Sequence, residues 1–177
     1  MDYDDTIDEF PNHPSSHTFP AAFAVAERVG NVSGEDFITS VALGVDLNVR
    51  LSAAPKGRVG EDYPWFSVPI FGVFSATAAA GKLLGLTVDE MVNAFGIAVD
   101  RVSGITESLN SPDSEIRAIR DGFGNREGVL AALMAKFKDC ARYSKNSLSE
   151  EQIIQLVTKI LDLERVKNIK EISEMIS

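Results

Sequence analysis

Apolar residues recur at helical spacing over most of the chain, and no sustained apolar/polar alternation marks a strand. Proline, glycine and capping residues divide this pattern into segments. Helices are expected over about 19–29, 37–51, 70–84, 91–102 and 129–135, then after Ser149 and after Asn168. The pattern predicts an all-α fold, a compact helical domain of roughly seven or eight helices that forms one domain over residues 1–177.

Helix ends are signalled by local chemistry. Ser33 and Thr87 each precede an acidic residue by three positions, Asp36 and Glu90, in the pattern of a capping box. Pro20 suits the first turn of the first helix, because a proline there removes no needed hydrogen bond.

Two helices are predicted to lie in the core. Apolar residues fall on nearly every face of 37–51, so this helix is expected to be buried on most sides. Gly72, Ala76 and Ala80 share one face of the next helix, which allows another helix to approach closely.

Composition narrows the function classes. The formal charge of −9, without a basic stripe, argues against a nucleic-acid partner. The longest apolar stretch, 68–86, is interrupted by glycines, Pro69 and Lys82, which fits a core helix better than a membrane span. The single Cys140 cannot form an internal disulfide, and the acidic N-terminus is unlike a secretory signal. We therefore expect a cytoplasmic protein with no membrane partner.

The first twenty residues concentrate the groups that move protons. They hold carboxylates, a hydroxyl and both imidazoles of the protein, followed by an apolar helix: Asp2, Asp4, Asp5, Thr6, His13 and His17. Carboxylate and imidazole beside a hydrophobic wall suit a general base and a general acid. A solvated acidic tail with a helix entry is the alternative, and residue type alone favours it.

Arg117 and Arg120 share a helical face at three-residue spacing. Guanidinium groups match carboxylates in a bidentate way, so this pair is the best candidate for binding a carboxylate. Solvated surface arginines are the alternative. Two histidines and one distant cysteine make a poor zinc set, and no phosphate or dinucleotide loop is present. We expect neither a metal nor a cofactor.

Several segments, in order, resemble the MmgE/PrpD family, which includes 2-methylcitrate dehydratase, cis-aconitate decarboxylase and iminodisuccinate epimerase. The matching segments are Asp2–Thr6, His13–Ser16, Ala78–Leu86, Asn93–Ala98 and Gly128–Ala135. Residues 1–135 resemble the family's helical core and 136–177 its C-terminal helices. The resemblance implies the family's helical domain without its first helices and without its α/β lid.

The resemblance also implies roles for individual residues. The implied catalytic residues are Asp2, Thr6 and His13, with His13 as the acid/base despite one extra residue in its spacing. Phe66 stands where several family members have histidine. The implied substrate-binding residues are Asp5, Ser15, Arg117 and Arg120.

Family resemblance favours a lyase or isomerase that removes a proton next to a carboxylate of a di- or tricarboxylate, such as 2-methylcitrate. A homodimer is expected, and a second copy could supply part of the closure that the lid provides. The alternative is a catalytically inactive helical remnant that serves as an oligomerisation or partner-binding domain. The amphipathic tail from Ser149 would then be one surface for a partner.

Overall fold

A computed structural model describes residues 4–7, 9, 12–55, 65–105, 115–142, 148–162, 165–168 and 170–175, without the side chains of 117, 118, 138–140, 142 and 173. Its helices are α1 (Pro14–Val29), α2 (Gly34–Ala53), α3 (Ser67–Leu83), α4 (Val88–Val99), α6 (Ile116–Arg142), α7 (Glu150–Leu161) and α8 (Lys170–Ser173). These described residues form seven helices and no strand beyond one isolated bridge, so the predicted all-α fold is confirmed.

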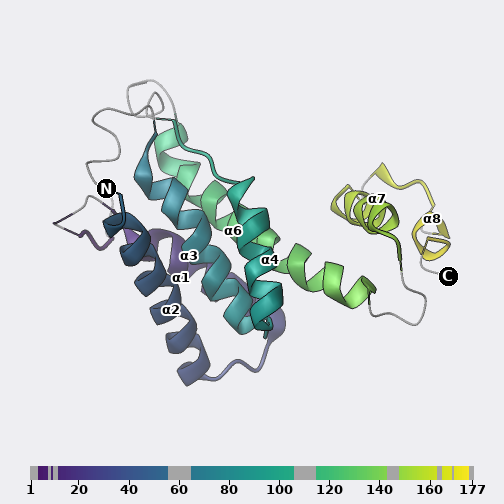
Figure 1. Cartoon of the computed structure of the whole chain (residues 1–177), viewed down its shortest axis with the longest axis horizontal. Helices are drawn as coiled ribbons and strands as arrows, with labels where there is room; N and C mark the ends of the chain where they lie inside the picture. The colour runs from purple at the N-terminus through teal and green to yellow at the C-terminus, as the bar shows by residue number, and fades with distance from the viewer. Residues whose placement is uncertain are drawn as a thin grey trace.

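The central helix of the bundle is α3, which contacts α1, α2, α4 and α6 (Figure 1). Eleven of its 17 residues are buried, and most of these are small. A helix covered on so many sides is a core helix, as its sequence predicts. None of the described helices is both long and apolar enough to cross a membrane.

Glycines set how closely the helices approach α3. A Cβ placed on Gly128 of α6 would lie 2.6 Å from the Ala76 Cβ and 2.7 Å from the Val73 carbonyl oxygen. A Cβ on Gly44 of α2 would meet the Ser75 carbonyl oxygen at 2.7 Å. These separations are too short for any side chain, so the close approach predicted at Ala76 is confirmed.

The first helix begins five residues earlier than predicted. It begins at Pro14 with His13 as the N-cap, and Pro20 lies inside it rather than in its first turn. The cap comes from outside the helix: the Asp5 carboxylate accepts a hydrogen bond from the Ser15 N–H at 3.0 Å. A contact across ten residues is invisible to a local capping rule.

Pro20 inside α1 leaves the Ser16 carbonyl without its usual intrahelical donor, because proline has no N–H. The Asn125 side chain of α6 donates to this carbonyl at 3.2 Å. A hydrogen bond between α6 and α1 thus replaces the one that is missing within α1.

The prediction that α2 is buried on most sides is wrong. Its buried residues are Ser40, Gly44 and Asn48, at four-residue spacing. Ile38 is 69% exposed and Leu43 is 42% exposed. The close approach of α2 to its neighbours leaves room only for small and hydrogen-bonded residues on the buried face, so the larger apolar residues of α2 are partly or largely exposed.

The predicted caps of the later helices are confirmed. The Thr87 hydroxyl accepts from the Glu90 N–H, and the Glu90 carboxylate accepts from the Thr87 N–H at 2.6 Å, which completes a capping box. This hydrogen bond lowers the pKa of Glu90. Ser33 caps α2, and Ser149 with Gln152 forms a second capping box at α7.

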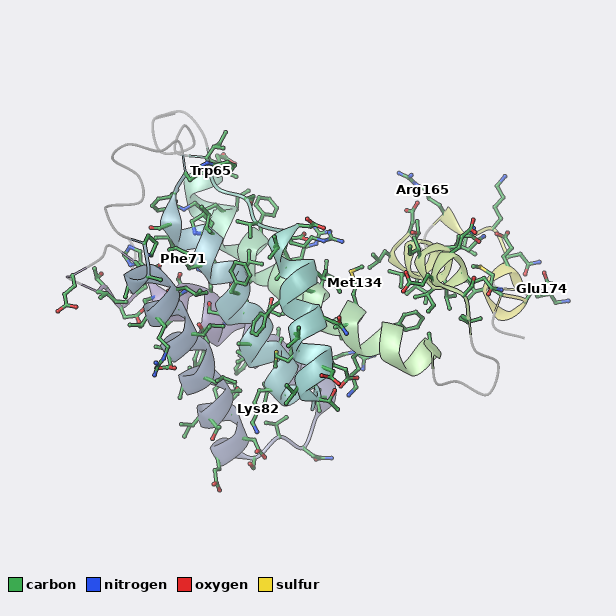
Figure 2. The ribbon with its side chains drawn as sticks, viewed as in Figure 1. Trp65, Phe71, Lys82, Met134, Arg165 and Glu174 are labelled. Atoms are coloured by element: carbon green, nitrogen blue, oxygen red, sulfur yellow. The ribbon has the colours of Figure 1, made fainter. Side chains whose placement is uncertain are left out.

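The helix expected at 129–135 is part of a single 27-residue helix, α6. The proposed division after residue 135 falls inside it and stays a prediction. α7 lies beyond the bundle (Figure 1) and buries Ile153 and Leu156. Met134 of α6 lies on the side toward α7, and both line one small apolar cavity (Figure 2).

We expect Gly128→Ala to lower the free energy of unfolding by about 1–3 kcal/mol, because the new methyl group overpacks the contact with α3. Gly122→Ala, in the same helix, is the matched control, since nothing lies within 4 Å of its added Cβ. There, alanine should raise stability by up to about 1 kcal/mol through helix propensity. Urea unfolding of the three proteins measures both effects; equal stabilities of the two variants would contradict the packing described here.

Candidate active site

The His13 imidazole is held by the segment that precedes α1. Its Nδ1 lies 2.9 Å from the Asp5 carbonyl oxygen and 3.4 Å from Oδ1 of Asp4. A carbonyl oxygen only accepts hydrogen bonds, so Nδ1 carries the proton of the neutral ring. Nε2 therefore carries the lone pair, which is the form that a general base requires.

Asp5 fixes this segment on the end of the helix. Its carboxylate accepts hydrogen bonds from both the N–H and the hydroxyl of Ser15, in the first turn of α1. A negative charge is stabilised there by the helix dipole. The Ile7 N–H donates to the Asn12 carbonyl at 3.2 Å, which turns the chain back toward the helix.

His17, one turn after His13, is fully buried. Its ring lies between two glycines of neighbouring helices, Gly72 of α3 and Gly124 of α6. A Cβ on Gly72 would lie 2.6 Å from Nδ1, and one on Gly124 would lie 2.8 Å from Nε2. The slot therefore exists only because both positions lack a side chain.

The tautomer of His17 follows from Ser16. The single Ser16 hydroxyl proton is donated to the His13 carbonyl at 2.8 Å. Because that proton is already used, Ser16 Oγ accepts a hydrogen bond of 2.9 Å from the Nδ1–H of His17. Nε2 is left as an acceptor that has no hydrogen-bond partner among the described residues, 3.9 Å from Oδ1 of Asp121.

Burial lowers the pKa of His17 from 6.5 to about 4. The Asp121 carboxylate opposes this shift, whereas the nearby charges of Arg120 and His13 add to it. His17 is therefore a neutral imidazole at neutral pH, embedded between three helices.

Arg120 supplies a buried positive charge next to this cluster. Its Nε lies 3.3 Å from Oδ1 of Asp121, and its guanidinium carbon lies 4.3 Å from the centre of the Phe66 ring. The Phe66 N–H donates to the Gly104 carbonyl at 2.8 Å, which fixes the aromatic platform.

Arg120 also lines a cavity of about 200 Å³ whose other walls are mainly apolar. The lining residues are Pro69, Ser103, Gly104, Ile105, Ile116, Arg120 and Phe123. A guanidinium in apolar surroundings attracts a carboxylate more strongly than one in water. The arrangement can therefore hold an acid that has an apolar body.

The structure brings some of the predicted site residues together. His13, Asp5 and Ser15 meet at the start of α1, and Arg120 pairs with Asp121, whose carboxylate lies 3.9 Å from Nε2 of the buried His17.

Of the other predicted positions, only Thr6 has a side chain among the described residues. Thr6 is exposed in the preceding segment. Asp2 lies outside the described residues, as does the Arg117 side chain, although residue 117 belongs to α6. The roles assigned to all seven residues stay predictions.

The MmgE/PrpD N-terminal domain matches residues 1–140 of the chain. The chain belongs to the MmgE/PrpD family. It is 32% identical over 142 residues to a cis-aconitate decarboxylase-like protein of Aspergillus oryzae, and the aligned segment covers 77% of this chain and 29% of that protein. It is 32% identical over 136 residues to the cis-aconitate decarboxylase of Aspergillus terreus (75% and 27%) and 25% identical over 138 residues to that of the mouse (76% and 28%).

This MmgE/PrpD chain thus spans less than a third of the length of the curated relatives it matches.

The sequence analysis did not predict the contacts made by four residues of this region: Asn12, His17, Asp121 and Asn125. A partial signal existed for His17, because the four-residue spacing places it one helical turn from His13. Nothing local indicates that Asp121 and Asn125 of α6 would meet α1.

We expect the stability of the protein to fall as the pH is lowered from 6.5 to 4, because the unfolded chain then binds a proton at His17 that the folded chain excludes. Across this window His17 accounts for a loss of about 3 kcal/mol. His17→Gln should remove that part of the pH dependence while it keeps a side chain of similar size.

Urea unfolding at several pH values measures the difference between the two proteins. Parallel stability curves from pH 6.5 to 4 would show that His17 is not a buried neutral group.

Proposed function

We propose that this chain supplies the acid/base part of an MmgE/PrpD site that acts on a di- or tricarboxylate, such as 2-methylcitrate or cis-aconitate. The observation that carries the proposal is the bond of 2.9 Å between His13 Nδ1 and the Asp5 carbonyl, which leaves Nε2 as the basic atom. The cis-aconitate decarboxylases among its relatives favour a tricarboxylate as the first compound to test.

In the proposed reaction, His13 Nε2 takes a proton from the carbon next to a substrate carboxylate, and the bonding electrons move into that carboxylate as an enolate. The new imidazolium is stabilised by Asp4, whose carboxylate lies 3.4 Å from Nδ1. The enolate then either expels hydroxide, which takes the proton from the His13 imidazolium and leaves as water, or is reprotonated by that imidazolium. Where carbon dioxide is lost, its loss follows reprotonation at another carbon, because carbon dioxide leaves its bonding electrons behind. Asp2 and Thr6 are proposed to orient the base and to hold a substrate oxygen.

Arg120, together with Arg117, is proposed to bind a substrate carboxylate. The buried position of Arg120 supports this role, since a guanidinium shielded from water stabilises developing negative charge most effectively. Asp5 and Ser15 already bind each other, so substrate contact with them requires exchange of that hydrogen bond. We further propose a cytoplasmic homodimer, in which a second copy helps to exclude water.

The alternative, an oligomerisation or partner-binding domain without turnover, is favoured by one observation. Phe19 and Phe23 stack, and Phe37 lies edge-on to both, with ring centres 5.5 to 6.4 Å apart. Phe19 is 48% exposed and Phe23 is 51% exposed. An exposed aromatic cluster of this kind is typical of protein–protein contacts.

We expect millimolar cis-aconitate, citrate or 2-methylcitrate to raise the melting temperature, since a ligand of the native state must stabilise it. At a hundredfold excess over Kd the gain is about 2.7 kcal/mol, or several degrees. Arg120→Gln should weaken the apparent affinity for the ligand at least about tenfold, because the buried charge proposed to bind the carboxylate is lost. The ligand-induced rise in melting temperature should be correspondingly smaller.

Arg50→Gln is the matched control: Arg50 is 75% exposed on α2 and pairs with Asp46 at 2.7 Å. It should leave the shift unchanged. His13→Ala should retain binding but lose turnover of the ligand that stabilises best. No shift with any of the three acids would favour the alternative function.

A further inference from the structure

A chain of buried polar side chains runs beneath His13, from the start of α1 into α2 and α3. Asn12 is 1% exposed, and Asn48 and Ser75 are fully buried. The Asn12 amide donates to Asn48 Oδ1 at 2.7 Å and to the Ser52 hydroxyl. The Asn48 amide in turn donates to Ser75 Oγ at 3.3 Å.

The hydrogen bonds of this chain have mutually consistent directions. Ser75 donates to the Gly72 carbonyl at 2.9 Å and Ser52 donates to the Asn48 carbonyl at 2.8 Å, so both hydroxyl oxygens are available to accept the amides. At the other end, Asn12 Oδ1 accepts the backbone N–H of His13 at 2.8 Å. The network therefore begins in the core and ends on the peptide group of His13.

Burial of two carboxamides is costly unless all their hydrogen bonds are made, and apolar residues of similar volume would fill the same space without that cost. A buried polar network that is fully satisfied instead specifies one geometry. Here it fixes the backbone conformation at the point where the chain enters α1.

We propose that Asn12 and Asn48 are positioning residues for the His13 imidazole. His13 has the non-helical dihedral angles φ −127° and ψ 77°, and its side chain does not cap the helix. Its N–H is held by Asn12, and its carbonyl is held by the N–H and hydroxyl of Ser16. With both peptide groups fixed, the ring lies against the Asp5 carbonyl.

The remaining anchors of this segment lie at the surface. The contact of Asp5 with Ser15 is exposed, as is that of His13 Nδ1 with the Asp5 carbonyl. Exposed hydrogen bonds compete with water, so the buried carboxamides determine whether the Nδ1–H tautomer of His13 persists. The inference rests on the proposed acid/base role of His13 but concerns only the state of its ring.

The test is ¹⁵N NMR of the full chain at about pH 8, where an ordinary imidazole is neutral, combined with exchange of the His13 amide proton. We expect the His13 ring of the wild-type protein to be the Nδ1–H tautomer. Asn48→Ala should shift it to a mixture with the Nε2–H form and should speed exchange of its amide at least about tenfold.

Ser40→Ala is the matched control, because Ser40 is equally buried on the same face of α2 but donates only to the Phe37 carbonyl of its own helix. It should change neither readout. If Asn48→Ala does not fold, Asn12→Asp carries the same test, since it keeps the acceptor for His13 and loses both donors. A variant with wild-type tautomer and amide exchange would overturn the inference.

These readouts need no substrate. An absence of turnover in the wild-type protein would count against the proposed function and leave the positioning inference standing. Conversely, full turnover with an unchanged His13 ring in Asn48→Ala would support the function and reject the inference.

Discussion

The insertion of the His17 ring between Gly72 and Gly124 is the contact on which the rest of this structure depends. It joins α1 to α3 and α6 at one point, and it leaves no room for a side chain on either glycine. The first turn of α1 cannot rotate or slide without moving this ring. His13, one turn earlier, is therefore fixed relative to the bundle although it is itself only half-buried.

Two departures from local rules support the same end of α1. Pro20 removes a hydrogen bond inside the helix, and Asn125 replaces it from α6. His13 occupies the N-cap without capping, and Asp5 supplies the cap from the preceding segment. Each departure exchanges an interaction within α1 for one with another part of the chain. This exchange is what a site built from several elements requires.

The charges at this end are arranged in two groups. Asp4 and the Asp5 carbonyl face the Nδ1 atom of His13. Arg120 faces Asp121 and Phe66, next to an apolar cavity. His17 lies between these groups and stays neutral, because burial outweighs the attraction of Asp121. The imidazole of His13 and the guanidinium of Arg120, the proposed base and the proposed carboxylate-binding group, thus have different carboxylate neighbours, Asp4 and Asp121.

The all-α fold, the capped starts of α2, α4 and α7, and the small-residue face of α3 could be predicted, because each depends on residues within one helix turn or one helix. The start of α1 could not, because its cap lies ten residues away. The buried face of α2 could not be predicted either, since the partners of Asn48 are 27 and 36 residues distant in the sequence. The same limit applies to the site. The acidic segment and His13 could be identified from composition and resemblance, whereas the burial of His17 depends on two remote glycines.

The most direct test of this account is a set of NOE distances from the ring protons of His17. We expect strong cross-peaks from the His17 Hδ2 proton to the α-protons of both Gly72 and Gly124. A folded protein in which α1 is helical but these cross-peaks are missing would contradict this, because α1 would then lack the contact that joins it to α3 and α6.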